Sequence, residues 1–160
     1  MQYLGDFATR FDQHFSQKNH TVHSDYTGKI EGDKFCIYKC GNIIMKIADS
    51  GVTPVCCGEP MKLLEPKMTD GAYEKHMPVV TKIDDCKVRI NVGSAPHPMI
   101  AEHYIMFIYV ETVDKDGHSG GKLIKLTPQD NPECTICSWD QKIVAVYEYC
   151  NLHGLWKLEL

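Results

Sequence analysis

Cysteine and histidine are the residues of this chain most able to do chemistry, with eight of each among 160 residues. Where thiols stay reduced, closely spaced cysteines indicate metal binding before disulfides. Four of the cysteines fall within residues 36–57, and another, Cys150, stands three residues before His153. These two groups are the candidate metal sites.

The C-terminal group gains three more histidines from the middle of the chain. His76, His97 and His103 join Cys150 and His153 to offer four borderline imidazoles and one soft thiolate. Such a set suits a redox-active first-row metal better than calcium or magnesium, which prefer oxygen ligands. Structural zinc usually takes four ligands, so five ligands with one position left free favour iron.

The segments around these residues resemble the desulfoferrodoxins and the related neelaredoxins. The resemblance rests on Glu-Lys-His-x-Pro-Val at 74–79, on His-Pro-Met at 97–99 with a histidine six residues after the first, and on Cys-Asn-Leu-His-Gly-Leu-Trp at 150–156. It extends from about residue 36 to residue 160. It implies an immunoglobulin-like β-sandwich that holds a catalytic iron between four equatorial histidines and an axial cysteine. The implied ligands are His76, His97, His103, His153 and Cys150.

The same resemblance implies a superoxide reductase, which reduces superoxide by one electron to hydrogen peroxide without releasing oxygen. An axial thiolate donates electron density towards the open position opposite the sulfur. In the family, the lysine matching Lys75 attracts the anion and assists protonation, and the glutamate matching Glu74 becomes a sixth iron ligand after the product leaves. The resemblance also implies a rubredoxin-like or other reductase as electron donor, and a homodimer or higher homo-oligomer.

The N-terminal cysteines resemble the small desulforedoxin-like domain, in which four thiolates hold a second iron. Cys40, Cys56 and Cys57 match that pattern, but Ile37 stands where the family has its first cysteine. Cys36 lies one residue earlier, and a one-residue bulge would still bring it to the metal, because ligand spacings of two to four residues are common. The predicted site is therefore a four-thiolate centre for iron or zinc. The alternative is a damaged site.

The remaining cysteines suggest no further site. Cys134 and Cys137 are predicted to be an incidental pair of thiols in a loop, with a labile disulfide between them as the alternative. No role is assigned to Cys86.

The elements expected to position these residues are mainly β. Alternating runs at 79–83 and 86–92 flank two aspartates and predict a hairpin. Further strands are expected at 103–113, 122–126 and 143–149, which together predict an antiparallel sandwich.

Three segments follow from this pattern. Residues 1–34 form an N-terminal extension with a short amphipathic helix over 4–15, residues 35–65 a desulforedoxin-like domain, and residues 66–160 the superoxide reductase sandwich. The three histidines of the extension, His14, His20 and His23, are expected to be solvated polar residues.

Composition narrows the class of protein. An apolar fraction of 43% and a charged fraction of 24% are those of a soluble globular chain. No apolar run approaches the ~20 residues that span a bilayer, and no secretory signal is visible, so a cytoplasmic location is expected. The net charge of −4 and the scattered basic residues argue against nucleic-acid or membrane partners.

Two other functions remain open. A non-catalytic electron carrier would use iron or copper, but a copper protein of this type wants a methionine shortly after His153, where Gly154, Leu155 and Trp156 follow. A structural zinc module would be colourless, whereas thiolate-ligated iron absorbs visible light.

Overall fold

The structure is a computed structural model that describes residues 35–37, 39–68 and 73–160. The predicted helix over 4–15 and the three histidines of the extension lie outside these residues. The described part is mainly β, with one short helix, α1 (Tyr73–His76), which confirms the predicted fold class. None of its helices has the length and hydropathy needed to cross a membrane.

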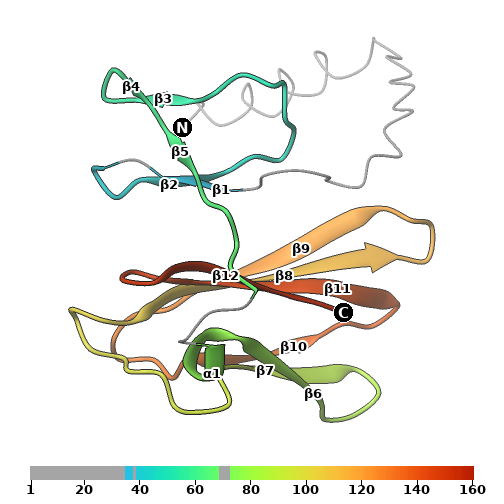
Figure 1. The fold of residues 1–160 in the computed structure, drawn as a ribbon. Coiled ribbons are helices and arrows are strands. Elements are labelled where there is room, and N and C mark those ends of the chain that lie inside the picture. The colour runs from blue at the N-terminus through green and yellow to red at the C-terminus, as the bar shows by residue number, and fades with distance from the viewer. Residues whose placement is uncertain (1–34, 38, 69–72) are drawn as a thin grey trace, which may run out of the picture.

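Two antiparallel sheets form a sandwich in the C-terminal part of the chain (Figure 1). The larger sheet has the order β12 (Gly154–Glu159), β11 (Gln141–Cys150), β8 (Ile105–Asp114) and β9 (Ser119–Lys125). The smaller sheet has the order β10 (Glu133–Cys137), β7 (Lys87–Val92) and β6 (Pro78–Lys82). The helix α1 leads directly into β6.

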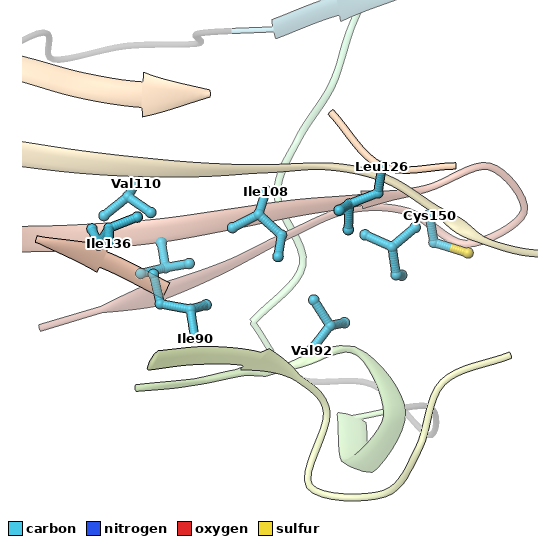
Figure 2. Packing of buried hydrophobic residues seen from close by; sticks show 9 residues of the cluster. Ile90, Val92, Ile108, Val110, Leu126, Ile136 and Cys150 are labelled. Atoms are coloured by element: carbon cyan, nitrogen blue, oxygen red, sulfur yellow. The ribbon is translucent and has the colours of Figure 1, made fainter. Parts of the chain in front are cut away.

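The sandwich core lies between the two sheets and consists of aliphatic side chains that alternate along each strand. Figure 2 shows side chains of β7 pointing towards those of the opposite sheet, with Cys150 at one end of the cluster. The buried members are Ile90, Val92, Ile105, Ile108, Val110, Leu126, Ile136, Val146 and Cys150. Because successive strand residues point to opposite faces, this pattern brings the thiol of Cys150 to the inner face of β11.

The outer face of the larger sheet is covered by a smaller cysteine-bearing unit. Its strands are β1 (Phe35–Ile37), β2 (Ile43–Met45), β3 (Val55–Cys56), β4 (Glu59–Pro60) and β5 (Lys62–Leu63). Phe35 packs against Phe107, Tyr109 and Tyr147, with ring centroids 5.4–5.9 Å apart. So short a unit cannot bury a core of its own, and it shares the aromatic face of the sandwich instead.

Three elements of the sandwich domain were absent from the sequence prediction. Strand β10 falls where a loop was expected, because its alternating pattern covers only five residues beside Pro132. Strand β12 follows the Gly154 turn, and it was not predicted. The helix α1 has four residues, too few to show a helical period.

A disulfide joins Cys86 to Cys137, so the prediction of an incidental thiol pair at Cys134 and Cys137 is wrong, and Cys86, to which no role was assigned, is the disulfide partner. Strand alternation separates Cys134 from Cys137. Cys134 packs on the sandwich core with Ile136, two residues later, whereas Cys137 faces the other way. The residue facing Cys137 across the ladder is Lys87, which places Cys86 next to it.

We expect the Cys86–Cys137 disulfide to stabilise the folded state, because it restrains an unfolded segment with a sequence separation of 51. Cys86→Ser should lower the free energy of unfolding by about 2–4 kcal/mol. Urea unfolding with and without dithiothreitol measures the effect, and reductant should shift the wild-type midpoint but not that of the variant. Equal midpoints for oxidised and reduced wild type would contradict the prediction.

Candidate metal centre

Five side chains converge at one end of the sandwich, and they are the five predicted from the sequence. The ligand atoms of His76, His97, His103, Cys150 and His153 all lie within 4.8 Å of one another. The imidazole Nε2 of His103 is 3.2 Å from Nδ1 of His153, which is 3.5 Å from the sulfur of Cys150. Two nitrogens at right angles and ~2.1 Å from one ion lie about 3.0 Å apart, so this spacing fits neighbouring ligands of a single metal.

His76 is held by the junction between α1 and the loop that follows β7. The backbone N–H of Ala95 donates to the carbonyl of Glu74 at 3.0 Å, and that of Gly93 donates to Met77 at 3.1 Å. Gly93 has φ +80, and a Cβ there would meet the Lys75 carbonyl at 2.7 Å. Only glycine permits this close approach, which fixes His76 relative to the loop that carries His97.

The ring of His76 is oriented by two buried side chains that face each other across β11 and β12. Its Nδ1 lies 3.1 Å from Oε1 of Glu148, and the ring stacks on Trp156 with centroids 4.9 Å apart at 9°. Glu148 and Trp156 are both fully buried and are partners in the ladder. With Nδ1 occupied by the carboxyl group, Nε2 of His76 remains available to a metal.

His97 is oriented in the same way by its own loop. Its Nδ1–H donates to the carbonyl of Pro98 at 2.6 Å, which leaves Nε2 as the free nitrogen. That Nε2 is buried and has no hydrogen-bond partner among the described residues. A buried polar atom without a partner is costly, and a metal bound by this cluster would satisfy it.

The other ligands are joined by the side chain of Asn151, which connects two loops. Its Oδ1 accepts the backbone N–H of Tyr104 at 2.9 Å, and its Nδ2 donates to the carbonyl of Glu102 at 3.0 Å. The first loop carries His103, and the second carries His153 and follows Cys150, the last residue of β11. Asn151 therefore holds the loop of His103 next to the segment of Cys150 and His153, although the two are far apart in the sequence.

Burial sets the protonation of the site. It lowers the pKa of His76 to about 3 and that of His97 to about 4, with the neighbouring imidazoles as a further cause at both. It also lowers the pKa of His103. These rings are therefore neutral at physiological pH, the form that binds metal. Burial raises the pKa of Cys150, which disfavours the thiolate until a cation compensates the charge.

Lys75 and Glu74 lie beside this cluster on α1, and both are exposed. The positive charge of Lys75 contributes, after burial and nearby groups, to the lowered pKa of His97 and of His103. Its field therefore reaches the site. Glu74 contacts the loop after β7 through its carbonyl, which also accepts the hydroxyl of Ser94 at 3.3 Å.

A second cluster contains three of the four N-terminal cysteines that were predicted as ligands. The sulfur atoms of Cys40, Cys56 and Cys57 lie within 4.8 Å of one another, and Cys36 is outside this set. The backbone N–H of Asn42 lowers the pKa of Cys40. Hydrogen bonding and charge from Cys56 raise the pKa of Cys57.

Comparisons with known proteins identify relatives of this chain. The model of the desulfoferrodoxin family matches residues 68–159. The desulfoferrodoxin of Nitratidesulfovibrio vulgaris is 45% identical over 130 residues, covering 79% of this chain and 98% of that protein. The superoxide reductase of Thermococcus kodakarensis is 33% identical over 106 residues, covering 59% of this chain and 92% of the relative.

A solved structure shows the same architecture. The crystal structure of the superoxide reductase from Treponema pallidum matches with a TM-score of 0.64 and 32% identity, covering 79% of this chain and 96% of that one. Fold, site and sequence together define a non-haem metalloprotein of the β-sandwich type. The chain belongs to the desulfoferrodoxin family.

The supporting roles of Glu148 and Asn151 were not predicted from the sequence. One signal was present for Glu148, since it precedes Cys150 by two residues in a strand and so must share its face. Nothing in the sequence identified His76 as its partner, which is 72 residues away.

Glu148→Ala should weaken iron binding about 10- to 100-fold, because the partner that orients a metal-bound histidine is lost. Glu148→Gln keeps an acceptor oxygen and should therefore weaken iron binding less than Glu148→Ala does. The rate of iron transfer to a chelator measures the effect, with Glu111→Gln as the control, since Glu111 is also a buried carboxyl but lies beside Tyr147. Equal transfer rates for wild type and Glu148→Ala would contradict the assignment.

Proposed function

We propose that this chain is a superoxide reductase that reduces superoxide to hydrogen peroxide at a mononuclear non-haem iron. The ligands would be His76, His97, His103, His153 and Cys150. The observation that carries the proposal is the convergence of these donors, within 4.8 Å of one another, in a member of the desulfoferrodoxin family. The relative named superoxide reductase in Thermococcus kodakarensis supports the same activity.

The donor set is suited to one-electron chemistry. A bound iron would supply the electron, and the thiolate of Cys150 would increase the electron density on it. Burial keeps the imidazoles of His76, His97 and His103 neutral, and Cys150 lies within the apolar core. A rubredoxin-like or other reductase would return the electron, and a homodimer or higher oligomer is the expected assembly.

Lys75 would attract the substrate and help to protonate it. The reaction O2•⁻ + e⁻ + 2 H⁺ → H2O2 brings an anion to the site and consumes two protons. The Lys75 ammonium places a positive charge beside the ligands in a chain of net charge −4. It would attract superoxide locally and hold a proton at Nζ close to the forming product. Glu74, its exposed neighbour, would act as the carboxylate ligand of the resting oxidised site.

Product stoichiometry tests the proposal directly. Iron-loaded, reduced protein is mixed with superoxide while hydrogen peroxide and oxygen are measured together. A reductase yields one hydrogen peroxide for each superoxide consumed and no oxygen. A dismutase would release oxygen, and a plain electron carrier would react only slowly, so either result would overturn the proposal.

Cys150→Ser should remove the visible thiolate-to-iron band and lower the rate with superoxide by at least about tenfold, because the electron-donating ligand is lost. Cys134→Ser is the control, since Cys134 is a partly buried thiol on β10. Stopped-flow absorbance measures both quantities. Retention of the band and of the full rate would show that Cys150 is not an iron ligand.

Lys75→Ala should slow the second-order reaction with superoxide about tenfold at low ionic strength, with a smaller difference at high salt, because a local charge is screened by ions. Lys82→Ala is the matched control, since Lys82 is an exposed lysine at the far end of β6. Rates over a salt series measure the effect. If both variants have the same salt dependence, the position of Lys75 has no special role.

A further inference from the structure

Cys40, Cys56 and Cys57 form a three-cysteine cluster. It is separate from the five-ligand site, which consists of His76, His97, His103, Cys150 and His153. The sulfur of Cys56 is 3.6 Å from that of Cys40 and 3.8 Å from that of Cys57. Thiolates bound to one zinc ion at ~2.3 Å and at tetrahedral angles lie about 3.8 Å apart. Two of the three sulfur–sulfur distances therefore match the spacing of a thiolate tetrahedron, and the third is within 4.8 Å.

The backbone is shaped to produce this arrangement. Successive residues of a strand point to opposite faces, so Cys56 and Cys57 would ordinarily diverge. Cys57 has φ +53, in the left-handed region that non-glycine residues rarely adopt, and this turns its thiol back beside that of Cys56. Gly58 follows at φ +82 and completes the turn. A conformation of this cost is retained where a local interaction requires it.

Cys36 is placed differently from the other three. It lies on the central strand β1, between Ile44 of β2 and Leu63 of β5 in the ladder, and it is only 2% exposed. The flanking residues Phe35 and Ile37 pack on the aromatic face of the sandwich, so alternation directs Cys36 away from that face. A free cysteine between aliphatic neighbours behaves as a small hydrophobic residue.

We propose that the three-cysteine cluster binds zinc through three protein thiolates and leaves its fourth position to solvent or to an exogenous ligand. Cys36 takes no part. Cys40 and Cys57 are exposed, which leaves the fourth corner accessible from solvent. The amide of Asn42 donates to the sulfur of Cys56 at 3.5 Å, as expected for a thiolate that accepts hydrogen bonds.

The number of ligands favours zinc over iron. Iron held by cysteines alone takes four of them, and the cluster supplies three. Zinc has no geometric preference from its d electrons, and sites with three protein ligands and one open position are common for it. The proposal is independent of superoxide reduction at the five-ligand site.

Zinc binding to variants of the full chain tests the ligand assignment. The protein is first loaded with iron at the five-ligand site, whose visible band also reports correct folding, and is then titrated with zinc against a chromophoric chelator. We expect one zinc per chain, a loss of affinity of at least about 100-fold in Cys40→Ser, and a change within about twofold in Cys36→Ala. Equal losses in both variants would make Cys36 a fourth ligand and overturn the proposal.

Cobalt spectroscopy of the wild-type chain tests the open position without any substitution. With iron already bound at the other site, cobalt is added to the three-cysteine cluster, and imidazole is then titrated. Imidazole should shift the cobalt d–d bands by entering the fourth position. Bands that do not respond would indicate a closed four-thiolate site, and iron rather than zinc in the purified chain would equally overturn the proposal.

Discussion

The structure depends on the inner face of strand β11. Within five residues, the side chains on this face change from core packing to support of the metal site. Val146 fills the core, Glu148 reaches His76, and Cys150 ends the strand as both a core side chain and a candidate ligand. Because these residues alternate on one face, a one-residue shift of register would remove all three from the interior at once. The strand is paired on both sides, with β8 and β12, which fixes that register.

The five-ligand site and the three-cysteine cluster use burial in opposite ways. His76, His97 and Cys150 are buried, so their donor atoms are held in place by packing and lose water as competitors. The three-cysteine cluster is largely exposed and is shaped by turns. Rigid support suits a site whose ligands come from segments far apart in sequence, whereas the cluster can be built from two short turns.

Much of the five-ligand site was predictable from sequence because its residue types are rare and their motifs are specific. The hairpin at 79–83 and 86–92 was predictable from alternation, and it corresponds to β6 and β7. Contacts between distant residues were not predictable. The Cys86–Cys137 disulfide and the hydrogen bond between Glu148 and His76 depend on which strands become neighbours, which residue spacing does not encode. The same limit applies to Cys36, whose spacing suits a ligand although the structure leaves it outside the cluster of Cys40, Cys56 and Cys57.

Charge balance explains why the buried site needs a cation. Burial raises the pKa of Cys150 and raises that of Glu148 well above its usual value, since each would carry a negative charge away from water. The neutral imidazoles of His76, His97 and His103 supply no compensating charge. A divalent cation among these ligands would stabilise both anions, so metal binding and loss of protons are coupled. Glu148 would therefore have two roles. It orients His76, and its negative charge would offset the positive charge of the metal at a site that solvent does not reach.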